Sequence, residues 1–203
     1  MRGLGIVSGA AIVLLSIAYG AVTIAGLAAL AAPRDPIGDP WFSAMEMLIL
    51  LLAPAMLGLM AATHAMAAGD ARAFTRASLA SMAIAMGLTC SLHLSILLLG
   101  HDPFLPGRPP FLWPSLSYFL DIAAWDVFFA LSLLLAAPAF ASAGLEKAIR
   151  LLLLASGVLA FAGLAGPITG DMRLRAIGIL GYAAVFPVAA GLMTLAFLRR
   201  RAG

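Results

Sequence analysis

Long apolar runs separated by short polar segments constrain this chain more than any other feature of its sequence. Six such runs can be read, each of about 18 residues or more, and a helix of that length crosses the roughly 30 Å hydrocarbon layer of a bilayer. Inside a bilayer every backbone polar group needs a partner within the protein, which a helix provides. The predicted helices cover residues 4–31, 45–68, 74–99, 114–140, 148–165 and 174–198.

The composition points to the same class of protein. The chain is 64% hydrophobic and 10% charged, with a mean hydropathy of +1.08, far from the mixture of a soluble domain. The sequence therefore predicts an all-α, polytopic membrane protein whose single domain, residues 1–203, is a six-transmembrane-helix bundle. The first run is nearly twice as long as the ~7–15-residue core of a secretory signal, so we expect it to be retained as a helix.

Basic residues are distributed unevenly between the two ends of the predicted bundle. With six spans both termini lie on one side, and that side carries Arg2, Arg72, Arg76, Lys147, Arg150, Arg199, Arg200 and Arg201. The other side carries only Arg34, Arg108, Arg173 and Arg175. Because cytoplasmic loops are enriched in Lys and Arg, both termini are predicted to be cytoplasmic. The segments WPSLSYFLDIAAWDVFF and GDMRLRAIGILGYAAVFP resemble those of small six-span bacterial membrane proteins, a likeness that implies no activity. The expected location is the bacterial cytoplasmic (inner) membrane.

Several function classes lack the residues that they need. The single cysteine, Cys90, excludes an intramolecular disulfide and a CxxC metal or redox motif. The only lysine, Lys147, lies at a membrane boundary, which excludes a retinal Schiff base in the membrane core. The sequence has no HExxH, GxSxG or phosphate-binding glycine loop, and the positive-inside pattern explains its isoelectric point of about 9.6. We therefore expect no cofactor and no nucleic-acid partner.

Two aspartates, Asp121 and Asp126, stand within the fourth apolar run. A charged side chain in the bilayer interior costs about 2.5–3.5 kcal/mol on insertion scales, so it occurs where it meets a partner, a cavity or a ligand. At 1.5 Å per residue from Trp113, Asp121 lies about 12 Å below the outer surface and Asp126 lies close to the midplane. These two carboxyl groups mark the fourth helix as the first place to look for a site.

Four more polar side chains belong to the same half of the membrane. The same count places Glu46 about 7 Å, His93 about 10 Å, Arg175 about 6 Å and Tyr182 about 16 Å below the outer surface. Because the lipid-facing sides of the helices must be apolar, we expect these groups to face one another. The sequence thus predicts an outward-facing polar cavity, half the membrane deep, formed by the second, third, fourth and sixth helices.

Spacings of three and four residues place further side chains on the same helix faces. The predicted inward stripes are Ser78, Met82, Met86, Thr89 and His93; Ser117, Asp121, Trp125 and Phe128; and Arg175, Gly178 and Tyr182. Asp126 is the exception, because five residues of an α-helix turn it about 140° away from Asp121. The two aspartates are therefore expected on one helix but on different faces.

These groups fit acid–base chemistry on a hydrophobic substrate. Carboxyl groups and a histidine can donate and accept protons, so the candidate catalytic residues are Asp126, Asp121, His93 and Glu46. The candidate ligand-binding residues are Trp125, Tyr118, Phe128, Thr89, Arg175 and Tyr182, whose rings can hold a hydrocarbon or stabilise a cation. The expected protein binds a membrane lipid, a lipid-like substrate or a small hydrophobic molecule. If it is an enzyme, we expect a cofactor-independent isomerase or cyclase.

Other roles stay open at this point. Ionisable groups at successive depths also suit a proton-coupled transporter or channel. Buried charges can instead fix helix register in a non-catalytic subunit or assembly factor, which would form an oligomer or complex through small-residue helix faces. Asp171 is placed to cap the last helix, and Gly5 and Gly9 form a GxxxG spacing that predicts close helix packing. The proline-rich loop, residues 101–110, suits either a lid over the cavity or a rigid connector.

Overall fold

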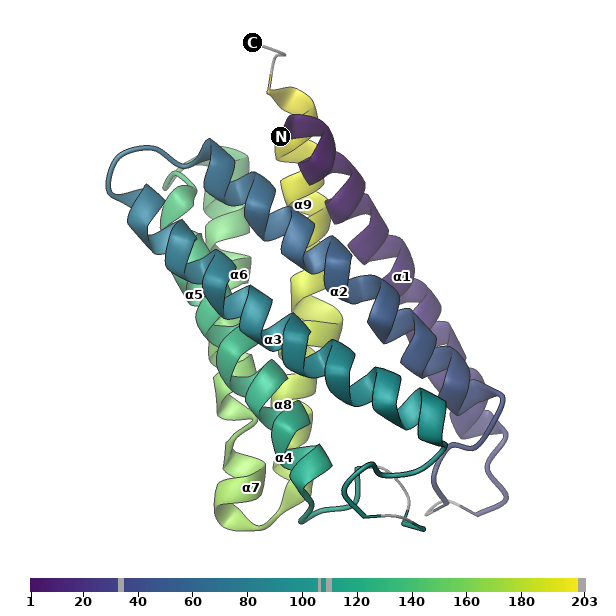
Figure 1. Cartoon of the computed structure of the whole chain (residues 1–203). Helices are drawn as coiled ribbons and strands as arrows, with labels where there is room; N and C mark the ends of the chain where they lie inside the picture. Colours follow the sequence, from purple (N-terminus) through teal and green to yellow (C-terminus); the bar gives the residue numbers. More distant parts are fainter. Residues whose placement is uncertain (33–34, 106, 109–110, 201–203) are drawn as a thin grey trace.

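The computed structural model describes residues 1–32, 35–105, 107–108 and 111–200, and every regular element within them is helical (Figure 1). Among these residues, six helical segments are long and apolar enough to span a membrane. The first three are single helices, namely α1 (Arg2–Ala28), α2 (Trp41–Met66) and α3 (Ala71–Leu99). The fourth span joins four elements: α4 (Leu116–Ile122), the π-helical η1 (Ala123–Phe129), α5 (Ala130–Ala136) and the 3-10 turn η2 (Ala137–Ala139).

The last two spans are also built from several elements. The fifth contains α6 (Gly144–Ala162) and α7 (Ala165–Thr169). The sixth contains the 3-10 turn η3 (Met172–Arg175), α8 (Ala176–Ile179), the π-helical η4 (Leu180–Val185) and α9 (Phe186–Arg199). The predicted all-helical architecture with six membrane-length spans is confirmed. The fifth span exceeds the predicted residues 148–165 at both ends, because hydropathy marks the apolar run while the helix itself continues through Glu146 and Lys147.

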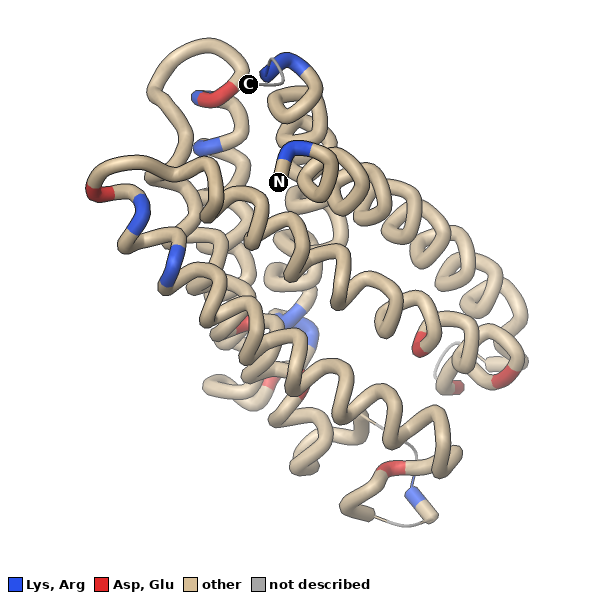
Figure 2. The backbone as a smooth tube through the Cα atoms, turned by 45° about the horizontal axis from the view of Figure 1, so that its top comes forward, with Lys and Arg blue, Asp and Glu red and all other residues tan. Residues whose placement is uncertain are grey.

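Both termini lie at one end of the bundle, which we call the terminal end; the opposite end is the distal end (Figure 1). Arg2 joins the first and last spans there, since its Nε and Nη2 atoms donate to the carbonyl oxygens of Phe197 and Leu198, each at 3.0 Å. Figure 2 shows most charged positions near the ends of the bundle and a smaller group inside it. The predicted charge count included Arg34 and Arg201, and the proline-rich loop includes Pro106, Pro109 and Pro110; these five lie outside the described residues.

The first span packs against the last through small residues. Gly5 and Gly9 are buried in the contact between α1 and α9. A Cβ atom added at Gly5 would overlap the ring of Phe197, and one added at Gly9 would lie 2.9 Å from the carbonyl oxygen of Ala190. The close packing predicted from the GxxxG spacing is confirmed. Elsewhere α1 is the least buried of the six spans, so most of its surface faces outward.

The predicted inward stripe of the third span is buried in the bundle. Each of its five side chains is at most 4% exposed: Ser78, Met82, Met86, Thr89 and His93. This face of α3 packs against α2 and the fourth span. The stripe thus carries His93 into the interior of the distal half.

Candidate functional site

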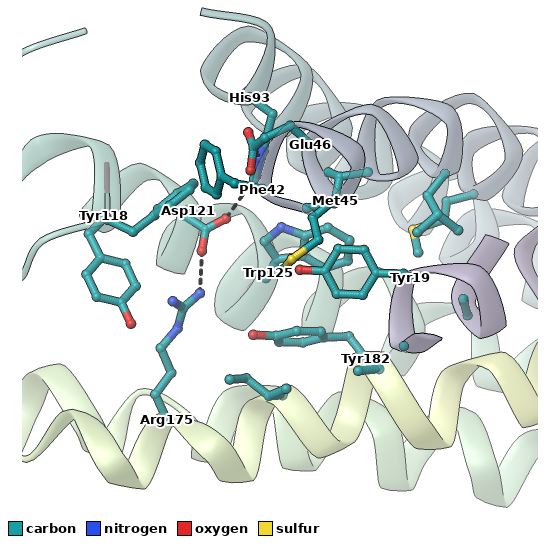
Figure 3. A pocket seen from close by; sticks show the side chains of 18 residues that line it. Tyr19, Phe42, Met45, Glu46, His93, Tyr118, Asp121, Trp125, Arg175 and Tyr182 are labelled. Carbon is teal, nitrogen blue, oxygen red and sulfur yellow. Dashed lines mark hydrogen bonds and ion pairs between the residues drawn. The ribbon is translucent and has the colours of Figure 1, made fainter. Parts of the chain in front are cut away.

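A cavity of about 300 Å³ lies inside the distal half of the bundle (Figure 3). Its walls come from α1, α2, α3, the segment before α4, the fourth span and the sixth span. Polar and charged side chains gather at one end of the cavity, while aromatic and aliphatic side chains surround the remainder. The cavity is therefore amphipathic, with a polar end and a larger apolar end.

Four buried ionisable side chains form a continuous chain at the polar end (Figure 3). Glu46 of α2 lies next to His93 of α3, with 2.8 Å between Oε2 and Nδ1. The other ring nitrogen of His93, Nε2, lies 3.4 Å from Oδ1 of Asp121, a longer contact. Arg175 of η3 donates from Nη2 to Oδ2 of Asp121 at 2.5 Å. Three helices and the start of the sixth span thus place their charges next to partners, as burial in an apolar bundle requires.

Asp126 belongs to the same charge network but lies behind it as seen from the cavity. Its Oδ2 atom accepts a hydrogen bond from Nε of Arg175 at 3.2 Å, yet its side chain is fully buried and does not line the cavity. The second oxygen, Oδ1, has no hydrogen-bond partner among the described residues. A Cβ atom added at Gly178 would lie 2.7 Å from this oxygen, and one at Gly163 would lie 3.1 Å from it. The two glycines therefore make the space that the carboxyl group occupies.

The prediction that Asp121 and Asp126 face different sides of the fourth span is wrong. Both carboxyl groups bind the guanidinium of Arg175. The physical reason is the π-helical η1, which contains Asp126 and has more residues per turn than the α-helix that holds Asp121, so the rotation between the two side chains is smaller. The same change of pitch buries Phe129 completely and leaves the predicted Phe128 only half-buried and away from the cavity.

A second π-helical turn, η4, places Tyr182 in the apolar end of the cavity. The ring of Tyr182 lies 5.0 Å from that of Trp125, centroid to centroid, and 6.2 Å from that of Phe129. Ser156 of α6 supports this turn by donating from Oγ to the carbonyl oxygen of Gly181 at 2.8 Å. The two π-helical turns face each other through their aromatic side chains, which is consistent with the frequent occurrence of π turns at functional sites.

Three tyrosines direct hydroxyl groups that have no protein partner toward the cavity. Tyr19 of α1, Tyr118 of α4 and Tyr182 of η4 all line it, and no hydrogen bond involves their hydroxyl groups within the described part of the chain (Figure 3). A phenol hydroxyl can donate one hydrogen bond and also accept. The walls therefore offer hydrogen-bonding groups beyond those used in the ion chain.

Phe111 covers the polar end from the distal side. Its ring centroid lies 5.4 Å from that of His93 and 6.1 Å from that of Tyr118. Tyr118 in turn stacks under Arg175, whose Cζ atom is 4.7 Å from the ring centroid. Phe111 has a φ of +59°, a conformation that non-glycine residues rarely adopt. Phe111, which follows the proline-rich loop, thus packs against the ion chain at His93.

The start of the sixth span is fixed by Asp171. Its Oδ1 atom accepts a hydrogen bond from the backbone N–H of Arg173 at 3.2 Å, so the predicted N-cap is confirmed. The Arg173 side chain is exposed and pairs with Asp171 at 2.9 Å, and this hydrogen-bonded pairing lowers the pKa of the Asp171 carboxyl. Arg175 follows the cap residue Asp171 by four positions, and its side chain is buried inside the bundle.

Most of the residues predicted for the site line this cavity. Those that do are Asp121, His93, Glu46, Trp125, Tyr118, Arg175 and Tyr182; those that do not are Asp126, Thr89 and Phe128. Thr89 is buried on the α3 stripe, and its hydroxyl has no partner among the described residues. The sequence prediction missed the contribution of α1, although Tyr19 is the only aromatic residue in the first apolar run. It also missed Phe42 and Phe111, which line the cavity as well.

Comparison with family models, with curated proteins and with solved structures finds no match for this chain. Among the described residues, no group of three or more His, Cys, Asp or Glu side chains is arranged to hold a metal ion. Evidence for a function therefore comes from the cavity, its charges and its position in the bundle.

Proposed function

We propose that this protein binds an amphipathic, lipid-like or small hydrophobic molecule in the distal cavity. One observation carries the proposal: a buried chain of four ionisable side chains stands at one end of a cavity whose other walls are apolar. A ligand of matching polarity places its head against Glu46 and Asp121 and its body among Trp125, Tyr182 and Tyr19. Small-molecule sites commonly combine apolar walls with a few convergent polar groups.

The proposal includes a location and an orientation. We place the protein in the bacterial cytoplasmic membrane with both termini in the cytoplasm, so that the distal cavity faces outward. Support comes from the larger number of basic residues predicted for the terminal end and from the general enrichment of Lys and Arg in cytoplasmic loops. Cysteine substitutions at the two ends, labelled with a membrane-impermeant maleimide in intact cells, test this orientation; labelling at the terminal end would contradict it.

Acid–base conversion of the ligand is the second part of the proposal. Glu46 and His93 share a 2.8 Å contact at the polar end, so a proton held between them lies next to the ligand. Adding that proton to one carbon of an alkene leaves a cation on the other alkene carbon, and removing a proton from the next carbon beyond that cation moves the double bond by one position. The proton returned to the Glu46–His93 pair balances the reaction, which consumes no other reagent.

Proton-coupled transport is the alternative, and the continuity of the network favours it. Glu46, His93, Asp121, Arg175 and Asp126 follow one another at hydrogen-bonding or near-hydrogen-bonding distances. Asp126 is enclosed, however, because Gly163 and Gly178 pack directly against its free oxygen. Proton flux into proteoliposomes that is abolished by Asp126→Asn would support transport over binding alone.

A cavity-filling variant tests the binding proposal. Gly20 lines the cavity, and a Cβ atom added there meets nothing within 4 Å, so Gly20→Leu fills space without a clash. Gly87 of α3 is exposed and equally unobstructed, which makes Gly87→Leu the matched control. We expect lipids extracted from the purified protein to show one species enriched by mass spectrometry, lost in Gly20→Leu and kept in Gly87→Leu. Equal lipid profiles for all three proteins would sink the proposal in favour of a structural subunit.

A further inference from the structure

We propose that the ligand is a cationic amphiphile, an alkyl amine whose protonated nitrogen binds at the polar end of the cavity. This inference rests on the proposed function and adds the charge of the head group. Three independent observations point to it: the balance of charge in the network, a carboxylate oxygen left without a partner, and the aromatic side chains around the cavity.

The network holds more negative than positive groups. Three carboxyl groups, those of Glu46, Asp121 and Asp126, face one guanidinium and one imidazole. With all three carboxyl groups ionised and the imidazole protonated, one negative charge is in excess. A buried excess charge is costly in an apolar bundle, so the site favours a ligand that brings a positive charge.

Glu46 supplies the free acceptor. It is 2% exposed and lines the cavity; its Oε2 atom is bound to His93, while Oε1 has no hydrogen-bond partner among the described residues. Asp121 lines the same wall. A protonated amine has two or three N–H donors, so it can bind Oε1 of Glu46 without displacing any contact of the ion chain.

Aromatic rings complete the surroundings of a cation. Phe111 and Tyr118 line the cavity at its polar end, where the ring of Phe111 lies 5.4 Å from that of His93. Ring faces attract cations, and the attraction grows when the cation is desolvated. This protein already uses that contact once, in the stacking of Arg175 over Tyr118 at 4.7 Å.

An anionic head group fits the site less well. Arg175 is the one guanidinium of the cavity wall in the described residues, and two of its nitrogen atoms already donate to Asp121 and Asp126. A phosphate or carboxylate ligand that binds Arg175 would bring its own negative charge next to those of the two carboxyl groups. Like charges at such distances repel.

Three probes of equal chain length test the inference: octylamine, 1-octanol and octanoate, each titrated into the full chain in nanodiscs. In a Trp41→Phe, Trp113→Phe background, Trp125 is the only tryptophan and reports directly from the cavity. Empty nanodiscs measure partitioning into lipid. We expect octylamine to bind roughly tenfold more tightly than 1-octanol and octanoate to bind most weakly. In Glu46→Gln the preference for the amine should shrink to about threefold or less, while the affinity for 1-octanol is kept.

The outcomes separate this inference from the proposed function. If 1-octanol or octanoate binds as tightly as octylamine, and Gly20→Leu blocks that binding, the head-group assignment is wrong and the amphiphile site stands. If none of the three probes binds saturably, both proposals fail. If Glu46→Gln does not fold, as judged by size-exclusion chromatography and circular dichroism, the probe series on the folded tryptophan background still decides the charge preference.

Discussion

Asp121 and Asp126 hold the same guanidinium although an α-helix of ordinary pitch would turn them about 140° apart. The fourth span becomes π-helical in η1, which begins after Asp121 and contains Asp126, and its wider turns reduce that offset. Arg175 is thereby bound on one side by a carboxyl group that reaches the cavity and on the other by one that does not. The cavity wall and the helix packing behind it consequently depend on a single side chain.

Removal of the guanidinium should destabilise the bundle. In Arg175→Gln both aspartates lose their charged partner, and leaving buried charges unpaired costs about 3–5 kcal/mol. Arg175→Lys should recover only part of this loss, because an ammonium cannot reproduce the planar arrangement of guanidinium donors. Reversible unfolding in mixed micelles measures the free energy of unfolding. If Arg175→Gln is as stable as the unaltered protein, Arg175 does not support the bundle. The double variant Arg175→Gln, Asp126→Asn should regain part of the lost stability.

The two aspartates should respond differently to the same substitution. Asp121 lines the cavity, so Asp121→Asn should weaken octylamine binding by roughly tenfold. Asp126 is fully buried behind Arg175 and touches no cavity wall, so Asp126→Asn should weaken octylamine binding less than Asp121→Asn does, while changing the unfolding midpoint. Parallel titrations and melting curves of the two variants provide the measurement. Equal losses of binding would mean that both carboxyl groups act on the ligand.

The glycines beside Asp126 should not tolerate a methyl group. In Gly178→Ala the new Cβ would lie 2.7 Å from Oδ1 of Asp126 and 3.1 Å from the Cα atom of Gly163. Such overpacking typically costs about 1–3 kcal/mol. Gly87→Ala, at an open position on α3, should instead be neutral or stabilise by about 0.5–1 kcal/mol. Urea or SDS titrations compare the two; similar effects at both positions would show that the helices can separate at little cost.

Acid should loosen the start of α2 through Asp39. This exposed carboxyl accepts hydrogen bonds from the hydroxyl and the backbone N–H of Ser43, at 2.5 and 3.0 Å, and these bonds lower its pKa below the usual 3.8. A group whose pKa is lower in the folded state stabilises above the unfolded pKa, and the contribution disappears as pH falls through the folded value. We expect the unaltered protein to melt higher than Asp39→Ala at about pH 6 and the gap to narrow below about pH 3.8. If the difference in melting temperature between the two proteins does not change with pH, the Asp39–Ser43 hydrogen bonds do not stabilise the start of α2.

The sequence was sufficient to predict the six spans and most of the charged groups that meet. Hydropathy marks each span, and the cost of burying Glu46, His93 and Asp121 in lipid requires that they face one another. The helix pitch could not be predicted in the same way. Counting at 3.6 residues per turn placed Phe128 inward and separated the two aspartates, whereas η1 reverses both outcomes. A π turn depends on contacts between distant segments, which a count along one helix does not contain.

The role of Tyr19 was missed for a related reason. The first apolar run has no Asp, Glu, Lys, Arg or His in its interior, so a search for charged residues passes over it. Its place at the cavity follows from packing of Gly5 and Gly9 against α9, which brings the whole helix close to the sixth span. The contribution of Tyr19 to the cavity therefore depends on how α1 packs, which the polarity of the sequence does not indicate.

The sparse burial of α1 has a consequence for how the site can change. This helix supplies Ser16, Tyr19 and Gly20 to the cavity wall but none of the ion chain, and it is the least buried span. Replacing residues on its inner face reshapes the space available to a ligand while every charge stays where it is. If the cavity binds the proposed amphiphile, substitutions on α1 alter the size of ligand that fits and leave the groups that meet its head in place.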